Sequence, residues 1–516
     1  MRRKLLWPLL LLCLVLLAGC TNLDQQEGPT PIDPPQDDTS RDEPAPEPKG
    51  LRAFSLPYFP SQTLDPITCP DGPHQTIAAL LYEGLYALDE HFELHPMLAQ
   101  SCTYDPDTFV YGITLRSGVL FSDGSPLTAA DVAASLERAR YAERYAGRLA
   151  DIVSVKAVGS AVYVALARPN ANFMARLDIP IVKAGTEHNA VPIGTGRYVW
   201  QEDGESALLA VNEGNWRHLQ LPVEQIPLVP CKDNDAMAYA FFSREIQLLA
   251  WDLTGTVAIN VSGANSYTDA PTAVMQYVGF NTNSPLFSDP ALRAAVSLGI
   301  DRERCVNACL LGHGEAASFP VSPASSLYPQ DLVRPYSAED YAAAMEAAGY
   351  QSGTEKTATM IVSAENTFRT DMARQIAEGL SQYDVKITVV PLPWAEFQSA
   401  LATGNYDLYY GECKLTADWD LTALLAERGA LNFSGYTDEE LPDLLYTALT
   451  TPAGRRSTAL KPLFTYLQQQ APFVPVCFKN VSVLLPEKGV EMVSPTAVDP
   501  FFHLTEWNIQ WVEEAS

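Results

Sequence analysis

Apolar residues recur along several stretches of the chain at the spacing of one helical face. Residues 128–131 (TAAD) resemble a capping box, and Val132, Leu136 and Ala139 follow on one helical face. Asp289 precedes a proline, and residues 337–340 (SAED) open another segment that Gly349 would close. The face of the segment after Asp289 consists of Leu292, Ala295, Val296 and Gly299. The pattern predicts helices after Thr128, after Asp289 and after Ser337.

Between residues 357 and 411 the pattern changes repeatedly from strand to helix. The expected elements are a strand at 357–363, a helix at 369–382, a strand at 385–390, a helix at 394–402 ended by Gly404, and a strand at 406–410. Such alternation favours a lobe with a mostly parallel sheet. Ligands of such sheets lie beyond the carboxyl ends of the strands, where residues 415–422 (LTADWDLT) follow.

The first twenty residues have the pattern of an export signal. Arg2, Arg3 and Lys4 precede an apolar run that is short for a membrane span. The run ends in residues 17–20 (LAGC), which look like the lipobox of bacterial lipoproteins. We therefore expect residues 1–20 to be a lipoprotein signal peptide, with the lipid on Cys20; the alternative is a chance cysteine after an ordinary signal.

Residues 21–50 are rich in proline and acidic residues and contain no aromatic residue. Such a segment cannot bury enough apolar surface to fold, so we expect a disordered tether. The folded body then begins near Leu51 and is long enough for two or three domains. The formal net charge of −28 argues against nucleic acid and against an anionic membrane surface as partners.

Cysteine and histidine spacing gives no sign of a catalytic or metal centre. The seven cysteines after Cys20 are scattered, and Cys305 and Cys309 share a helical face without zinc-site neighbours. No two histidines have the spacing of a metal-binding helix, and no nucleophile motif or phosphate-binding loop is present. We expect no metal and no cofactor, and a binding protein instead of an enzyme. Whether any of these cysteines pair stays open.

A series of short motifs carries a family resemblance. In chain order they are residues 63–66 (TLDP), 81–85 (LYEGL), 96–99 (PMLA), 115–124 (LRSGVLFSDG), 127–132 (LTAADV), 194–198 (GTGRY), 279–282 (GFNT), 292–295 (LRAA) and 300–302 (IDR). Their order and spacing resemble the family 5 extracellular solute-binding proteins, which feed dipeptides, oligopeptides or nickel to ABC importers. The resemblance runs from about residue 60 to about residue 480.

This resemblance implies an α/β fold of the type II periplasmic-binding-protein class, with two lobes and a hinge. Lobe I would comprise residues 51–70, 190–278 and 482–516, with an additional domain inserted at 71–189. Lobe II would comprise residues 279–481, and the hinge would lie near residues 277–281 and 478–483. The implied partners are an ABC permease and an ATPase, and we expect a monomer, lipid-anchored on the outer face of the cell membrane or in the periplasm.

The resemblance also suggests where the ligand binds. In the peptide-binding members an Ala-Asp-aromatic stretch carries the aspartate that meets the ligand's α-ammonium, and Ala417-Asp418-Trp419 matches it. Trp419 would wall the pocket, and Asp420 would face the same side as Asp418 if the segment is extended. The oligopeptide-binding members have tryptophan and cysteine before this aspartate, whereas Leu415 and Thr416 stand here, and Val274 stands where a partner of Cys413 would be expected.

Other residues are weaker candidates for ligand binding, and Asp418 itself has alternative roles. The other expected ligand-binding residues are Tyr58, Ser61, Trp251, Tyr410 and Gly411. Asp418 could instead cap a helix at 421–425 or lie in a solvated turn. The leading prediction is the binding subunit of a peptide importer. The alternatives are a binding protein for a sugar, an opine or a nickel complex, a ligand-sensing receptor, and, most distantly, a secreted hydrolase that uses Asp418 and Asp420 as an acid/base pair.

Overall fold

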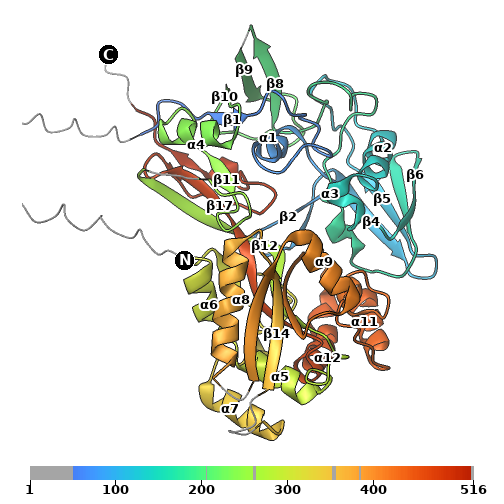
Figure 1. Ribbon diagram of the computed structural model, residues 1–516. Helices are drawn as coiled ribbons and strands as arrows, with labels where there is room; N and C mark the ends of the chain where they lie inside the picture. Colours follow the sequence, from blue (N-terminus) through green and yellow to red (C-terminus); the bar gives the residue numbers. More distant parts are fainter. Residues whose placement is uncertain (1–49, 205, 260–262, 351–355, 383–384, 513–516) are drawn as a thin grey trace, which may run out of the picture. The chain divides into compact units, whose positions relative to one another are not determined.

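The computed structural model describes residues 50–204, 206–259, 263–350, 356–382 and 385–512 (Figure 1). The signal peptide, the lipobox at 17–20 and the acidic tether up to residue 49 lie outside the described residues. Within the described ranges, every helix is too short or too polar to cross a membrane.

The first sheet lies near the start of the described chain. Its four strands, in spatial order, are β1 (Leu56–Tyr58), β10 (Gln225–Pro230), β9 (Ser206–Val211) and β8 (Tyr198–Asp203). β1 runs parallel to β10, and the other neighbours are antiparallel. Alternate residues such as Leu56, Leu209 and Ile226 point into one hydrophobic core, which α1 (Pro73–Leu81) covers with Ile77 and Leu80.

The second sheet is antiparallel and has its own core. Its strands, in spatial order, are β4 (Ala99–Asp105), β5 (Val110–Leu115), β7 (Ala161–Leu166) and β6 (Ile152–Val158). The helix α2 (Ala129–Ala139) packs on it, followed by α3 (Glu143–Ala146), and a small hairpin of β2 (Tyr86–Leu88) and β3 (Leu94–Pro96) lies before it. The expected start of α2 is confirmed: the Thr128 main-chain N–H donates to Asp131 Oδ2 (2.9 Å), and Asp131 N–H donates to Thr128 Oγ1 (3.4 Å).

The third sheet has seven strands, and residues 415–422 follow one of them. Its path is β11 (Leu249–Trp251), β17 (Phe473–Pro486), β12 (Asn265–Phe280), β16 (Leu408–Lys414), β14 (Lys356–Ser363) and β15 (Val385–Leu392), with β13 (Gly314–Ala316) paired to β17. β14 is parallel to β15 and β16, whereas β12 and β17 are antiparallel to their neighbours. The expected strand–helix alternation is confirmed, but the sheet is mixed instead of mostly parallel.

Helices cover both faces of this seven-stranded sheet. Figure 1 shows α8 (Thr367–Leu380) and α9 (Trp394–Thr403) on opposite sides of β14, and their apolar residues belong to two different cores. Gly404 ends α9 in the left-handed region (φ 69°), as expected. The remaining helices are α4 (Asn234–Phe242), α5 (Pro290–Leu298), α6 (Arg302–Cys309), α7 (Ala338–Ala347), α10 (Thr422–Leu425), α11 (Leu441–Thr450) and α12 (Ala453–Gln470).

The starts of α5 and α7 are also confirmed. Asp289 Oδ1 accepts a hydrogen bond from the Ala291 main-chain N–H (2.9 Å), and Ser337 Oγ accepts one from Asp340 (3.2 Å). The chain then leaves α7 through Gly349, whose φ is 84°. Local capping chemistry therefore fixes these boundaries as the sequence indicates.

One strand boundary was predicted wrongly. The strand expected at residues 406–410 instead runs as β16 from Leu408 to Lys414, because it pairs with β12 all the way from Phe280 back to Val274. Long-range pairing therefore extends the strand beyond the local apolar run. Tyr410 and Gly411 consequently lie in the middle of the strand, not at its end.

Among the described residues the longest strands are β12 and β17, with 16 and 14 residues, and they pair along most of their length. Their register shifts between Pro271 and Met275 and again between Gln276 and Tyr277. The expected hinge segments, residues 277–281 and 478–483, fall on or directly beside these two strands. The hinge and the lobe boundaries stay predictions.

Candidate functional site

Residues 415–422 leave the end of β16 in a turn and not as an extended strand. Trp419 has a left-handed backbone (φ 50°), which few residues other than glycine adopt. Despite this turn, Asp418 and Asp420 both reach the guanidinium of Arg176. The two carboxylates therefore do share one side, although the segment is not extended.

Asp418 is fully buried (0% exposed). Its Oδ2 accepts hydrogen bonds from Arg176 Nε (2.8 Å) and Asn170 Nδ2 (2.7 Å), and its main-chain oxygen accepts one from Arg456. Its second oxygen, Oδ1, is buried and has no hydrogen-bond partner among the described residues. Two alternatives for Asp418 are therefore wrong: it is not in a solvated turn, and it does not cap α10.

Asp420 makes the contact with α10 instead. Its Oδ1 accepts the main-chain N–H of Thr422 (2.9 Å), and its Oδ2 contacts Arg168 and Arg176 Nη2, the latter at 2.7 Å. Burial alone would raise the pKa of this carboxyl, but Arg176 and Arg168 outweigh burial and hold the pKa far below its usual value. Asp420 therefore stays ionised at neutral pH and is unsuited to act as a general acid.

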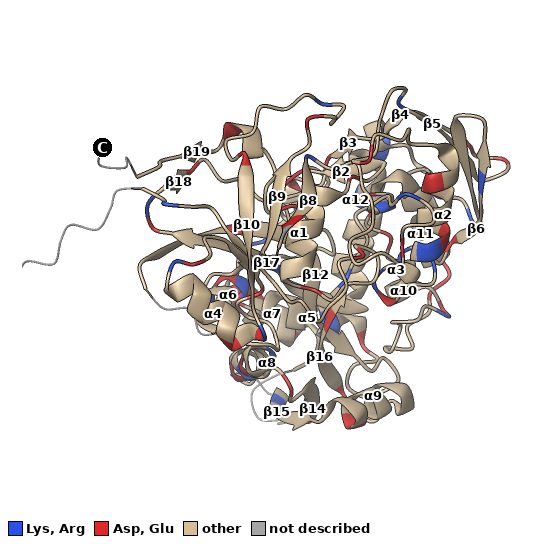
Figure 2. Cartoon of the chain, turned by 90° about the horizontal axis from the view of Figure 1, so that it is seen from above, with Lys and Arg blue, Asp and Glu red and all other residues tan. Residues whose placement is uncertain are grey.

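The arginine partners of both carboxylates come from the segment after β7. Its Asn172 side chain donates to Thr451 O (3.0 Å), and Ala171 N–H donates to Leu449 O (2.9 Å). Asp151 also contacts both arginines of this segment. We call this group the Arg–Asp cluster, which comprises Asp151, Arg168, Arg176, Asp418 and Asp420. It joins the region of the second sheet to the end of β16, and Figure 2 shows residues of both charge signs around α10.

The charges in the Arg–Asp cluster stabilise each other. Burial would lower the pKa of Arg176, but Asp418 and Asp420 raise it above its usual value. Nearby, burial lowers the pKa of Arg148 to about 10, although the charge of Asp418 acts in the opposite direction. The cluster is thus a set of buried ion pairs that depend on one another.

The aromatic and glycine residues predicted around Asp418 are packed inside the protein. Trp419 is 3% exposed, and its ring meets Phe92 and Phe478 edge-on at centroid distances of 5.0 and 6.1 Å. Tyr410 is buried and donates its hydroxyl to Gln276 Oε1 (2.7 Å). At Gly411 a Cβ would lie 3.0 Å from the Tyr409 ring and 3.2 Å from the Tyr277 ring, so only glycine fits there comfortably.

The candidates from the early part of the chain lie around the first sheet and β11. Tyr58 lines a pocket of about 330 Å³ together with Gln62 and Trp200, whose ring meets the Tyr58 ring edge-on at 5.7 Å. Ser61 is exposed beside this pocket without lining it. Trp251 donates its indole N–H to Val257 O (3.0 Å). The structure does not bring these residues into direct contact with the Arg–Asp cluster.

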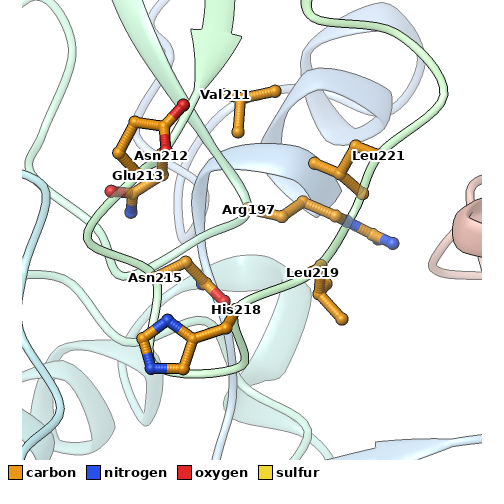
Figure 3. Close-up of a pocket in the computed structure, with 8 residues that line it drawn as sticks. All are labelled: Arg197, Val211, Asn212, Glu213, Asn215, His218, Leu219 and Leu221. Carbon is orange, nitrogen blue, oxygen red and sulfur yellow. The ribbon is translucent and has the colours of Figure 1, made fainter.

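A second pocket, of about 170 Å³, lies beside the first sheet (Figure 3). Several of its polar groups are already used within the protein: Asn212 donates to Gly196 O (2.8 Å), Asn215 to Thr195 O (3.0 Å) and Arg197 to Phe501 O (3.0 Å). These groups hold the surrounding loops together and have few donors left for a ligand. We assign no binding role to this pocket.

A serine, a histidine and an aspartate meet at the β12–β17 pair. Ser482 Oγ donates to Asp269 Oδ1 (2.6 Å), and His313 Nδ1 lies 3.1 Å from Asp269 Oδ2 and 3.3 Å from Ser482 Oγ. A catalytic triad needs the histidine to contact serine and aspartate through different ring nitrogens. Here one nitrogen serves both, so the arrangement is not that of a serine hydrolase.

Sequence reasoning missed Arg168, Asn170 and Arg176. The only available signal was their polarity in a segment between two strands, which is common in loops. Their partners follow more than 240 residues later, so spacing along the chain could not have paired them. Among the described residues no group of three metal-binding side chains was found, and all seven cysteines there are free, with Cys305 and Cys309 packed in the core.

Comparison with known proteins identifies the family. The family model described as "Bacterial extracellular solute-binding proteins, family 5 Middle" matches residues 93–424, more than half of the chain, and the chain belongs to this family. The glutathione-binding protein GsiB of Escherichia coli K12 is 26% identical over 450 residues, which cover 81% of this chain and 87% of GsiB. The expected family is therefore confirmed.

Two solved structures confirm the fold class. The murein tripeptide-binding protein MppA, in its unliganded open form, is 19% identical with a TM-score of 0.73, over 90% of this chain and 99% of MppA. The nickel ABC transporter protein from Bacillus halodurans is 20% identical with a TM-score of 0.73, over 87% of this chain and 98% of that chain. The fold is that of type II periplasmic binding proteins. The chain is thus an extracellular solute-binding subunit of an ABC importer, and it acts with permease and ATPase subunits.

Proposed function

We propose that this protein binds short peptides at the Arg–Asp cluster and delivers them to its permease. The observation that carries the proposal is the Asp418 carboxylate, which is fully buried and has one oxygen, Oδ1, without a donor among the described residues. A buried acceptor of this kind requires a partner, and the ammonium group of a peptide supplies charged donors. The names of two relatives, a glutathione-binding and a murein tripeptide-binding protein, support a peptide ligand.

In this proposal the ammonium group binds Asp418 Oδ1, while Arg176 and Asn170 keep Oδ2 in place. Asp420 supports the site by holding Arg168 and Arg176. Trp419 forms the wall behind the site. Tyr410 and Gly411 fix the strand that leads to Asp418, and Tyr58, Ser61 and Trp251 are the proposed contacts from the opposite side of the ligand.

We also propose that the mature protein is attached to the membrane by a lipid on Cys20 and acts as a monomer. The lipobox pattern of residues 17–20 supports the attachment, and the proline-rich segment after it would separate the lipid from the folded body. Metabolic labelling with a radioactive fatty acid checks this, because replacing Cys20 with alanine would abolish the label.

Asp418→Asn is the variant that tests the peptide proposal. The substitution keeps the shape of the side chain but removes the charge that pairs with an ammonium group. We expect the Kd of peptides with a free amino end to rise about 100-fold, the effect of losing a charged partner worth about 3 kcal/mol. The Kd of the same peptides with an acetylated amino end should change less than about threefold. Isothermal titration calorimetry measures both.

Asp371→Asn is the matched control, because Asp371 lies in an exposed pair on α8 and should affect neither peptide class. Thermal melting of each variant shows whether the folded state persists during the titration. An equal loss for free and acetylated peptides would assign Asp418 a purely structural role. Binding of a sugar or a metal complex, with no peptide bound by the unaltered protein, would exclude a peptide importer.

A further inference from the structure

Positively charged side chains gather at the end of β16, next to Asp418. Lys414 is the last residue of β16. Arg148 Nη2 donates to Arg176 O (2.6 Å), and Arg176 Nη1 donates to Arg148 O (3.1 Å), so Arg148 lies against the residue that holds Asp418. Arg144 is one helical turn before Arg148 on the chain. These cations come from two segments that are distant in the sequence.

The whole chain is acidic, with 34 lysines and arginines against 62 aspartates and glutamates. Six cations nevertheless lie in the segments that meet near the end of β16: Arg144, Arg148, Arg168, Arg176, Arg456 and Lys414. Four of them pair with carboxylates, namely Asp71, Asp151, Asp178, Asp418 and Asp420. Arg456 and Lys414 form no ion pair with a described carboxylate, and in so acidic a chain such cations indicate a site for an anion.

Lys414 is the cation of this group that most clearly lacks a counter-charge. It makes no ion pair and no side-chain hydrogen bond with any described residue. Its side chain keeps exposed surface, yet burial lowers its pKa, and Arg148 and Arg144 lower it further, with Asp71 acting in the opposite direction. Lys414 is therefore an exposed cation that lies near two arginines and has no counter-charge within ion-pair distance among the described residues.

Unpartnered buried atoms occur in the same two segments, residues 144–148 and 414–418. Among the described residues, seven buried side-chain nitrogen or oxygen atoms have no hydrogen-bond partner, and three of them are Arg144 Nε, Thr416 Oγ1 and Asp418 Oδ1. Leaving such atoms unpaired costs free energy, so each requires an explanation. An unpaired donor on Arg144 and an unpaired acceptor on Asp418 fit a ligand that carries both an anionic and a cationic group.

A third segment completes the surroundings of these residues. Arg144 pairs with Asp71 through Nη1 and donates to Cys69 O through Nη2 (2.8 Å). At Gly72 a Cβ would lie 3.5 Å from the ring of Trp251, which places that predicted ligand-binding residue beside the same loop. Residues 69–72, 144–148 and 414–418 therefore meet at one place, where the proposed peptide would lie.

We infer that Lys414, Arg144 and Arg148 form a carboxylate subsite next to Asp418, and that the preferred ligand is a short peptide with an acidic side chain near its amino end. This inference rests on the proposed function, since it takes Asp418 as the position of the ammonium group. Lys414 supplies the charge without a partner, and Arg144 supplies an unused donor. Arg148 raises the positive potential without giving up its own pair with Asp178.

The test compares two tripeptide amides that differ in one group, Glu-Ala-Ala-amide and Gln-Ala-Ala-amide. Both have a free ammonium group, and neither has a terminal carboxylate, so only the side-chain carboxylate differs. We expect the unaltered protein to bind the glutamate peptide at least tenfold more tightly by calorimetry. Lys414→Gln should reduce this preference to less than threefold, with little change for the glutamine peptide. Lys461→Gln, in an exposed pair with Asp331, is the matched control and should keep the preference.

Arg144→Gln provides a second variant, so that a folding defect in one protein does not decide the result. The inference is overturned if peptides bind but the unaltered protein shows no preference for glutamate, or if both variants keep the preference. If no peptide binds at all, the proposed function itself fails. Citrate and a nickel–histidine complex are titrated in parallel, and binding of either one without peptide binding identifies a non-peptide anion or chelate and rejects both proposals.

Discussion

Replacing Arg176 with methionine is expected to lower the free energy of unfolding by about 3–5 kcal/mol. The Arg176 side chain is only 4% exposed and pairs with two buried carboxylates, Asp418 and Asp420. Methionine fills a similar volume but leaves both carboxylates without their main counter-charge. Urea denaturation followed by circular dichroism measures the change.

Arg374→Met is the matched control for this prediction. Arg374 pairs with Asp371 on the surface of α8 and is 60% exposed, so its loss should cost less than about 1 kcal/mol. Combining Arg176→Met with Asp418→Asn should destabilise less than the sum of the two single changes, because the second change removes a charge that the first left unpaired. A loss for Arg176→Met no larger than that of the control would contradict a structural role of the Arg–Asp cluster.

Asp420→Asn is expected to destabilise the protein by about 3 kcal/mol at neutral pH, and by progressively less in acid. The folded-state pKa of Asp420 lies far below the value of about 3.9 in an unfolded chain, because Arg176 and Arg168 outweigh the effect of burial. Its pairing therefore stabilises the fold fully above pH of about 4, and this contribution is lost as the pH falls toward the folded-state pKa.

The difference in unfolding free energy between the unaltered protein and Asp420→Asn should thus be constant from pH 7 to about 5 and shrink below about 4. Urea titrations at four or five pH values give this curve. Asp371→Asn serves as the control, since its exposed pair should give a small difference throughout. A difference that grows in acid would have the wrong sign and would exclude the assigned ion pairs.

The local structure was largely predictable from the sequence. Capping residues such as Thr128 and Asp289 predicted the starts of α2 and α5. Between residues 357 and 411, the change between strand-like and helix-like spacing of apolar residues predicted strands of the seven-stranded sheet and the helices between them. These signals are local, because a cap bonds to residues two or three positions away. The end of β16 was missed, because its pairing with β12 lies more than 120 residues away in the sequence.

The candidate site was predictable only in part. The Ala-Asp-aromatic motif identified Asp418 as a candidate ligand-binding residue. The sequence could not show that Arg176 and Asn170 both donate hydrogen bonds to its carboxylate. The orientation of Trp419 could not be predicted locally either, since its left-handed backbone and its contacts with Phe92 and Phe478 depend on the folded chain. Family motifs locate a functional segment, whereas the partners of its side chains follow from tertiary structure.

The proposed function requires the buried carboxylate of Asp418 to bind a peptide ligand. Native mass spectrometry of the body from residue 50 onward, purified without a tag, tests this most directly, because a co-purified ligand is released and its mass is read in the same experiment. We expect one bound peptide per chain, absent from Asp418→Asn and retained in Asp371→Asn. A bound sugar or metal complex, or a peptide that Asp418→Asn retains equally well, would contradict it.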